Sequence, residues 1–98
     1  MTWLRMIMSE PWRILYTKLA LKEKKIACEA GLKNKIEEIL KIMKSNPFTA
    51  YPPYEKLTGD LAGVYSRRIN LQHRIIYQVY AEKRIIKIIS MWLHYEKI

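Results

Sequence analysis

The feature that most constrains the fold is a run of apolar residues that repeats with the period of a helix between residues 32 and 43. These residues occur at i, i+4, i+7, i+8 and i+11, which places them on one side of a helix. The pair Asn46-Pro47 follows, and a helix does not continue through proline. The pattern therefore predicts a helix whose apolar face must be covered by another element. The residues of that face are Leu32, Ile36, Ile39, Leu40 and Met43.

A second amphipathic pattern, over residues 18–30, comes just before this helix. Leu19, Ile26 and Ala30 fall on one stripe with Ala20 and Ala27 beside them, and several lysines face away from it. Gly31 follows, and glycine readily takes the left-handed conformation that ends helices. We therefore expect two helices with almost no loop between them, whose joint apolar faces need a sheet to cover them.

Runs rich in branched and aromatic residues predict the strands of that sheet. Short turns join the later runs, so successive strands in this part of the chain must be antiparallel. The expected fold class is α+β, with two N-terminal helices packed on an antiparallel sheet of about four to five strands. The predicted strands span residues 12–17, 55–61, 64–69, 74–80 and 84–93.

Length and composition limit the organisation of the chain and its partners. Its 98 residues form one predicted domain, residues 1–98, in which residues 1–11 are an N-terminal extension. Eighteen Lys and Arg against nine acidic residues give a net charge of +9, for which nucleic acid is the first candidate partner. No apolar stretch has the length of a secretory leader or a spanning helix, so we expect a cytoplasmic protein without a membrane partner.

Cysteine and histidine usage argues against disulfides and metals. The single cysteine, Cys28, cannot form an internal disulfide, and its place in a helical stripe favours a small buried side chain. No Cys/His spacing typical of zinc ligands occurs, and there is no glycine-rich phosphate loop. The sequence therefore predicts no metal site and no cofactor.

Positive charge is concentrated where two predicted strands meet. Arg67, Arg68, His73 and Arg74 lie within eight residues. Side chains alternate across a strand, so Arg67 and Arg68 must point to opposite faces of the sheet. Arginine clusters favour a bidentate grip on phosphate. Charge alone leaves a second interpretation open, in which these are two solvated strand faces.

Three further residues complete a set that could cleave RNA without a metal. Glu55 is a lone acid in a basic, aromatic setting, and His94-Tyr95 closes the last predicted strand. Such cleavage needs a base for the ribose 2′-hydroxyl, cations for the phosphorane and an acid for the leaving 5′-oxygen. The alternative interpretation is a surface salt bridge for Glu55 and a merely exposed His94.

The same residues resemble a known family. The stretch from Pro47 to Val79 contains Pro-Phe, Glu-x-Leu, Leu-x-Gly-x-Tyr-Ser-Arg-Arg-Ile and His-Arg-Ile-Ile-Tyr in order, and His94-Tyr95 closes the chain's last strand. This series resembles the YoeB/Txe family, a branch of the RelE-like toxins of bacterial toxin–antitoxin modules. It covers about half of the chain, and the helical half agrees in layout rather than in motif.

The resemblance implies a microbial-ribonuclease-like fold, two helices on a curved antiparallel sheet. It implies a toxin that enters the ribosomal A site and cuts translating messenger RNA, so the ribosome and mRNA are expected partners. It also implies an acidic, partly disordered antitoxin that covers the groove and displaces the C-terminal residues. A homodimer is an assembly that this interpretation leaves open.

The resemblance also implies a role for each residue of this chain that matches a functional position of the family. Glu55 would be the general base, His94 the general acid and Tyr95 the residue that positions the substrate base. Arg74 would stabilise the phosphate with help from Arg68. Further contacts to RNA phosphates are expected from Arg67, Lys56, Lys22 and Lys25.

The chain departs from the family pattern at two places. Thr58 stands where members often carry lysine, and Lys56, the neighbouring lysine, points to the opposite face if the strand is regular. Residues 96–98 extend beyond the His-Tyr pair, where the family commonly stops. An alternative function keeps the fold without nuclease activity, either as a gyrase-directed toxin of the ParE kind or as a plain nucleic-acid-binding module.

Overall fold

The structure, a computed structural model, describes residues 11–50, 53–57 and 63–91. Two helices precede most of the sheet along the chain, as the amphipathic patterns predict. In order, the elements are β1 (Arg13–Tyr16), α2 (Lys18–Ala27), a π-helical turn (Cys28–Leu32), α3 (Lys33–Ser45), β2 (Tyr54–Lys56), β3 (Val64–Arg68), β4 (Arg74–Tyr80), a 3-10 turn (Ala81–Lys83) and β5 (Ile85–Ser90).

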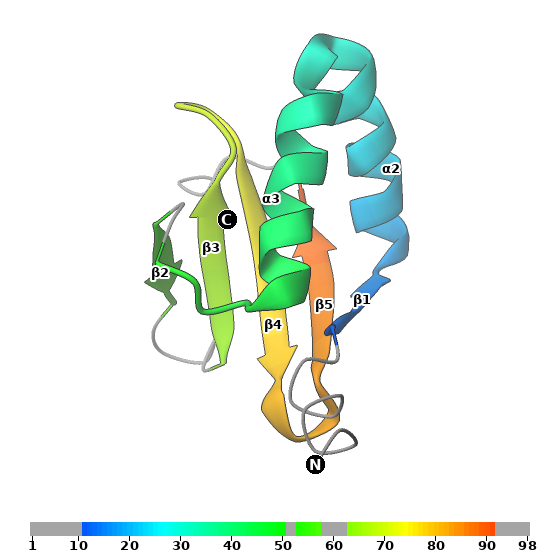
Figure 1. Cartoon of the computed structure of the whole chain (residues 1–98). Helices are drawn as coiled ribbons and strands as arrows, with labels where there is room; N and C mark the ends of the chain where they lie inside the picture. Colours follow the sequence, from blue (N-terminus) through cyan, green and yellow to red (C-terminus); the bar gives the residue numbers. More distant parts are fainter. Residues whose placement is uncertain (1–10, 51–52, 58–62, 92–98) are drawn as a thin grey trace.

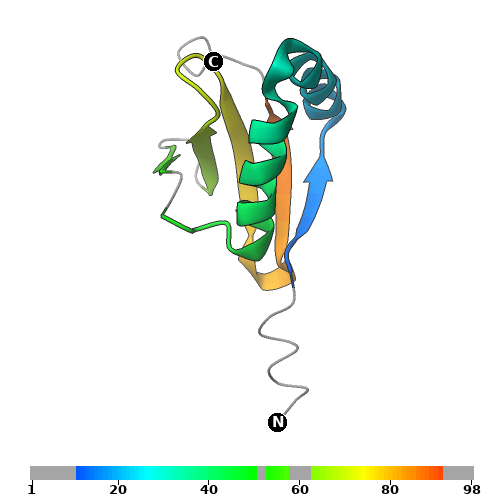
Figure 2. The same ribbon diagram turned by 45° about the horizontal axis from the view of Figure 1, so that its top comes forward.

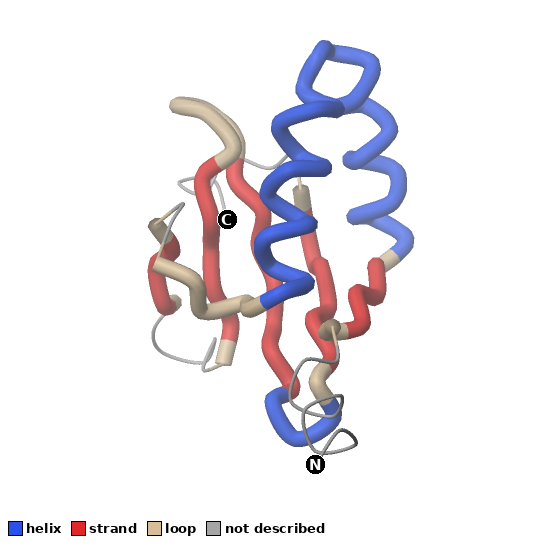
Figure 3. Tube along the Cα trace, viewed as in Figure 1, coloured by secondary structure: helices blue, strands red, loops and turns tan. Residues whose placement is uncertain are grey.

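The strands form one sheet in the order β1-β5-β4-β3-β2, and the helices lie together on one face of it (Figures 1 and 3). Figure 2, turned by 45°, shows α3 running along β4 and β5. The predicted α+β class with helices packed on a five-stranded sheet is therefore confirmed.

One strand pair corrects the predicted antiparallel sheet. β1 pairs with β5 in parallel, whereas the β2–β3, β3–β4 and β4–β5 pairs are antiparallel. Only strands joined by short turns are forced to be antiparallel. The chain from β1 passes through both helices and three strands before it reaches β5, so that pair is free to be parallel. The sheet is therefore mixed.

The helical hairpin follows local sequence signals at both ends of α2. The side chain of Thr17 caps the helix by accepting a hydrogen bond from the Ala20 N–H at 3.0 Å. At the other end Gly31 has φ of +93°, a conformation that residues with a Cβ rarely adopt. The predicted turn at Gly31 is confirmed, although α2 ends at Ala27 and a π-helical turn leads into the glycine.

The predicted apolar face of α3 is confirmed. Ile36, Ile39, Leu40 and Met43 are all buried, and they share a core with strand residues such as Ile86. Burying a Leu, Ile or Met side chain stabilises a fold by roughly 1.5–3 kcal/mol, so this face supplies much of the energy that holds α3 on the sheet.

The predicted stripe on α2 is wrong, although the two alanines expected beside it are buried. The buried residues of this helix are Ala20, Glu23 and Ala27, whereas Leu19 and Ile26 are exposed. Small alanine side chains let the backbone of α2 approach the sheet closely. The carboxylate of Glu23 is tolerated on this face because it accepts hydrogen bonds from the end of β5.

Candidate active site

The strand register brings the predicted base and the predicted phosphate ligands to one face of the sheet. Glu55 on β2 is opposite Ser66 on β3, and Arg68 on β3 is opposite Arg74 on β4. Directly opposed residues share a face, and residues two apart on a strand do as well. Their neighbours Tyr65, Ile75 and Tyr77 belong to the core under the helices. Glu55, Ser66, Arg68 and Arg74 therefore lie on the face that the helices leave uncovered.

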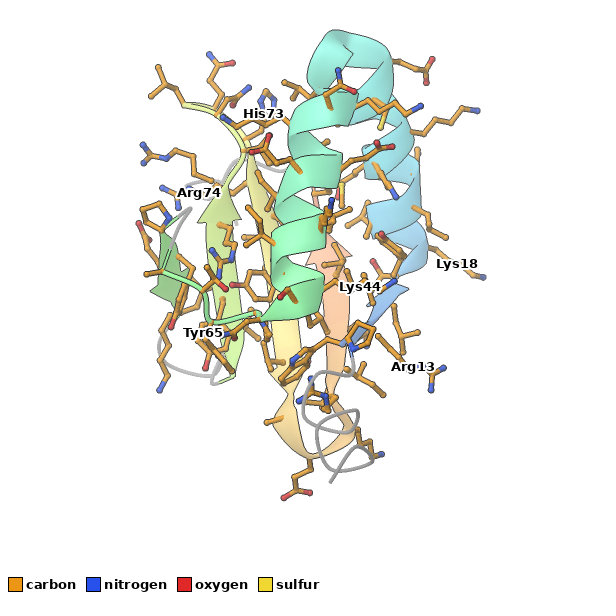
Figure 4. The ribbon with its side chains drawn as sticks, in the orientation of Figure 1. Arg13, Lys18, Lys44, Tyr65, His73 and Arg74 are labelled. Carbon is orange, nitrogen blue, oxygen red and sulfur yellow. The ribbon has the colours of Figure 1, made fainter. Side chains whose placement is uncertain are left out.

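Arg74 and Glu55 form an ion pair on this face. Arg74 Nη1 lies 3.6 Å from Glu55 Oε1, and the same nitrogen donates a hydrogen bond to Ser66 Oγ at 3.3 Å. The side chain of Arg74, labelled in Figure 4, is 17% exposed and that of Glu55 is 58% exposed. The guanidinium is thus partly shielded and held by two neighbours, while the carboxylate remains open to a ligand from solvent.

The adjacent arginines point in opposite directions, as strand alternation predicts. Arg68 is exposed, whereas Arg67 is 0% exposed on the helix side of β3. The interpretation of Arg67 as an RNA contact is therefore wrong: its guanidinium is enclosed and its donors are engaged inside the protein. Of the two, Arg68 is the one that can meet a phosphate.

The buried guanidinium of Arg67 holds the segment that leads into β2. Its Nη2 donates to the carbonyl oxygens of Pro47 and Thr49, both at 2.7 Å, and its Nε donates to Tyr77 Oη at 3.1 Å. The guanidinium also stacks on the Tyr54 ring, 4.9 Å from its centroid. Tyr54 immediately precedes Glu55, so Arg67 contributes to the site by positioning the strand that carries the carboxylate.

An aromatic cluster surrounds this network. The ring of Tyr65, labelled in Figure 4, lies 5.5 Å from Phe48, 5.7 Å from Tyr54 and 5.8 Å from Tyr77 between centroids. Such ring pairs are worth about 0.5–1.5 kcal/mol beyond the area they bury. The cluster therefore braces β2 against the sheet beneath Glu55.

Tyr77 makes the stability of the protein depend on pH in the alkaline range. Burial of the phenol raises the pKa of Tyr77 from its usual 10.0 to about 12, against the opposing effect of the nearby Arg67 charge. Because the unfolded chain ionises first, the stability conferred by the neutral phenol is fully present below about pH 10 and is lost as pH rises toward 12.

We expect the free energy of unfolding to fall by about 3 kcal/mol over this window because of Tyr77, and Tyr77→Phe to remove that part of the pH dependence. Urea unfolding of both proteins at several pH values between 8 and 12 measures it. Parallel pH profiles for the two proteins would contradict the assignment. Tyr80→Phe, at an exposed position, is the control.

The predicted lysine contacts do not join the Glu55–Arg74 face. Lys56 is opposite Tyr65 in the register, so it points to the helix side of the sheet, as a regular strand requires. Lys22 and Lys25 are exposed on α2, in the layer that covers the other face. Any contact of these three lysines with RNA would therefore be made away from the carboxylate.

Two predicted site residues, His94 and Tyr95, lie outside the described part of the chain, as does Thr58, the position at which the chain departs from the family pattern. The turn between β3 and β4 is described. There Asn70 Oδ1 accepts from the backbone N–H groups of Gln72 and His73, each at 2.8 Å, and lies 3.1 Å from His73 Nδ1. This turn sets the start of β4 and hence the position of Arg74.

Sequence reasoning missed Ser66 as a partner of Arg74. Ser66 is buried, and its hydroxyl accepts a hydrogen bond from Arg74 Nη1 at 3.3 Å. The signals in the sequence are its place in the Tyr-Ser-Arg-Arg-Ile motif and its position one residue before Arg67, which puts it on the opposite face. That it meets Arg74 depends on the register between two strands, which the sequence does not specify.

Among residues 11–50, 53–57 and 63–91, His, Cys, Asp and Glu nowhere gather in a group of three that could hold a metal ion. Within the same ranges, no helix has the length and apolar character needed to span a membrane.

Comparison with known proteins agrees with both the fold and the order of the sequence motifs. A family model described as "YoeB-like toxin of bacterial type II toxin-antitoxin system" matches residues 16–95. The chain belongs to this toxin family. The YoeB toxin of Synechocystis is 35% identical over 66 residues, which make up 67% of this chain and 74% of that protein. The YoeB toxin of Escherichia coli O6:H1 is 38% identical over 52 residues, 53% of this chain and 62% of that protein.

Solved structures agree with this membership. The YoeB/ParE toxin from Agrobacterium tumefaciens superposes with a TM-score of 0.76 at 28% identity, covering 85% of this chain and 99% of that one. YoeB from Staphylococcus aureus, solved as a dimer, superposes with a TM-score of 0.73 at 34% identity over 86% of this chain and 98% of that one. The S. aureus protein has also been solved as a heterotetrameric YoeB–YefM toxin–antitoxin complex. The predicted family is thus confirmed.

Proposed function

We propose that this YoeB-family chain is a ribosome-dependent endoribonuclease that cleaves translating mRNA by metal-free acid–base chemistry. The observation that carries the proposal is the Glu55–Arg74 ion pair, whose Oε1 and Nη1 atoms lie 3.6 Å apart on the face of the sheet opposite the helices. Membership in a family of type II toxins supports an action against a central cellular process.

The proposal assigns one step of the cleavage to each group. The open carboxylate of Glu55 takes the proton of the ribose 2′-hydroxyl, and the 2′-oxygen attacks the adjacent phosphorus. The 5′-oxygen leaves and takes a proton from His94, which gives a 2′,3′-cyclic phosphate and a free 5′-hydroxyl. A positioned base or acid contributes about 10²–10⁴-fold each. Tyr95 positions the base of the bound nucleotide.

Arg74 stabilises the negative charge that develops on the phosphorane, with Arg68 assisting from the same face. Unit charges at about 4 Å interact by about 4 kcal/mol at an effective dielectric constant of 20, against about 1 kcal/mol in bulk water. The partial shielding of Arg74 therefore strengthens its effect on a bound phosphate. Ser66 keeps the guanidinium on this face.

The proposed partners follow from charge and kinship. A net charge of +9 suits ribosomal RNA and mRNA, and the exposed lysines of α2 are available to RNA on the helix side. An acidic antitoxin is the proposed regulatory partner, since YoeB from S. aureus was solved in complex with YefM. The proposed place of action is the cytoplasm, where ribosomes translate.

Glu55→Gln tests the proposal. We expect it to slow cleavage of mRNA on programmed ribosomes by about 10²–10⁴-fold, because the amide cannot accept the 2′-hydroxyl proton. The 5′ ends of the mRNA products are mapped, and Glu38→Gln, at an exposed position on α3, is the matched control. Unchanged cleavage by Glu55→Gln would contradict the proposal. A DNA-damage response without mRNA cuts would favour a gyrase-directed toxin.

A further inference from the structure

The outer edge of β1 has no partner strand in the described part of the sheet. β1 is the first strand in the order β1-β5-β4-β3-β2, so it pairs with β5 on one side only. The N–H groups of Arg13 and Thr17 donate to carbonyl oxygens on the β5 side, at 2.9 and 3.0 Å. Backbone groups of neighbouring residues in a strand point in opposite directions, so those of Ile14 and Tyr16 point to the outer edge. Such an edge is a template for a second extended chain.

A groove, the β1–α3 groove, lies between this strand and the second half of α3. It is lined by all of β1 and by one face of α3, and its volume is about 740 Å³. Ligand sites in proteins commonly have volumes of about 300–1,000 Å³. The Trp12 N–H donates to the Lys44 carbonyl oxygen at 2.8 Å, which ties the start of β1 to the end of α3. The two walls of the groove are therefore fixed to each other at one end.

The inner wall of the groove is apolar. Trp12 and Leu40 are buried, whereas Ile14 and Tyr16 are half-buried and pack against the main core. A chain that lies in the groove can therefore cover the apolar surface that Ile14 and Tyr16 still expose, and burial of such surface favours binding.

The rim of the groove is basic. Arg13 on β1 and Lys41 and Lys44 on α3 are exposed there, against one exposed carboxylate, that of Glu37. Three cations and one carboxylate give the rim a net charge of +2. Figure 4 shows Arg13 on β1 and Lys44 at the end of α3. A partner that complements this charge is acidic.

These features favour a protein segment over RNA and over a second copy of this chain. A nucleic acid has no backbone N–H and C=O groups with the spacing of a strand, and its phosphates would be repelled by Glu37. A second copy paired through β1 would place two chains of net charge +9 together and bring their Arg13 side chains close. An extended acidic peptide meets the free edge, the apolar wall and the charge of the rim at once.

We propose that the β1–α3 groove is a docking site for an extended acidic segment of a partner protein, which adds a strand to the outer edge of β1. Apolar residues of the segment face the groove, and its carboxylates meet Arg13, Lys41 and Lys44. β1 is at the opposite edge of the sheet from β2, which carries Glu55. The docked segment therefore leaves the Glu55–Arg74 pair open, and its binding does not rest on the proposed ribonuclease function.

The binding test uses a synthetic peptide that alternates valine with glutamate over about six residues, a usual strand length. Its affinity for the full chain is measured by fluorescence anisotropy at low salt. A peptide with lysine in place of glutamate is expected to bind at least about tenfold more weakly, and added salt is expected to weaken binding of the acidic peptide.

Charge reversal on α3 locates the binding site. Lys41→Glu combined with Lys44→Glu is expected to weaken binding of the acidic peptide by at least about tenfold, because two attractive pairs become repulsive. The matched control combines Lys33→Glu with Lys35→Glu, since both lysines are exposed on the same helix and neither lines the groove. It is expected to stay within about threefold of wild type.

Ile14→Pro tests whether the peptide adds a strand. Proline removes the N–H that points to the outer edge, and edge strands tolerate it there. Ile14→Ala is the control, because it shortens the side chain and keeps the N–H. We expect Ile14→Pro to bind the peptide at least about tenfold more weakly than Ile14→Ala. In the wild-type protein, saturating peptide is expected to slow amide hydrogen exchange of Ile14 and Tyr16 at least about tenfold. These exchange rates and the lysine variants decide the question if Ile14→Pro does not fold.

Any of four results would overturn the proposal: no binding of the acidic peptide at low salt, equal affinity for the lysine peptide, wild-type affinity in the Lys41→Glu/Lys44→Glu variant, or unchanged exchange at Ile14 and Tyr16. Displacement of the peptide by a single-stranded RNA of similar length would assign the groove to nucleic acid instead. A dimer in sedimentation that Ile14→Pro abolishes would assign it to a second copy. Failure of the wild-type protein to cleave mRNA would contradict the ribonuclease function and leave these binding results unaffected.

Discussion

Arg74→Ala is expected to slow mRNA cleavage on programmed ribosomes by about 10²–10³-fold, the cost typical of removing one group that stabilises a transition-state charge. The guanidinium is held between Glu55 Oε1 and Ser66 Oγ, so it meets a phosphate with little rearrangement. Binding to the ribosome is expected to change much less, because many other positive charges contribute to it. Single-turnover rates and binding measured on the same ribosomes separate the two effects.

The matched control is Arg13→Ala, which removes an exposed arginine at the other edge of the sheet. It is expected to leave the cleavage rate within about threefold of wild type. Neither substitution is expected to alter stability much, because a partly exposed ion pair contributes about 0–1 kcal/mol. Equal cleavage rates for Arg74→Ala and Arg13→Ala would show that Arg74 does not act in cleavage.

Arg67→Met is expected to lower the free energy of unfolding by about 3–5 kcal/mol. This loss comes from buried hydrogen bonds and does not depend on any role of Arg67 in cleavage. The carbonyl oxygens of Pro47 and Thr49 and the Tyr77 hydroxyl would lose their donor in a buried place. Methionine fills part of the space but donates no hydrogen bond. Since domains of this size are stable by roughly 5–15 kcal/mol, the loss is a large fraction of the total.

Arg68→Met is the matched control, because it changes the same residue type one position away on the exposed face. We expect a change within about 0.5 kcal/mol, as for most surface substitutions. Urea unfolding followed by circular dichroism measures both variants. If they were equally stable, the buried network around Arg67 would not hold the segment that leads to β2.

These two predictions separate neighbouring arginines by function. Arg74 lies where a ligand can meet it, and Arg67 lies where it organises the protein. A cluster of basic residues in the sequence does not reveal this difference, because each arginine contributes the same charge whether its side chain is buried or exposed. Alternation along β3 assigns Arg67 and Arg68 to opposite faces, but which face the helices cover depends on the pairing of the whole sheet.

Local signals predicted the parts of the fold that depend on neighbours in the sequence. The apolar period of α3, the left-handed turn at Gly31 and the antiparallel pairing of β3 with β4 are set within short stretches, and the structure confirms them. The buried face of α2 was not predictable in this way. Its stripe of larger apolar residues is exposed, because alanines and the hydrogen-bonded Glu23 fit against the sheet instead.

From the sequence by itself, the family, the fold class and the candidate roles of Glu55 and Arg74 could be stated, since motif order and periodicity are properties of the linear chain. Only the tertiary structure decided that β1 runs parallel to β5, that Arg67 is buried, and that Ser66 joins the ion pair. It also decided that Glu23 holds the end of β5, 67 residues away. Each of these depends on which distant segments pack together, and that packing is selected by the free energy of the whole core rather than by any local pattern.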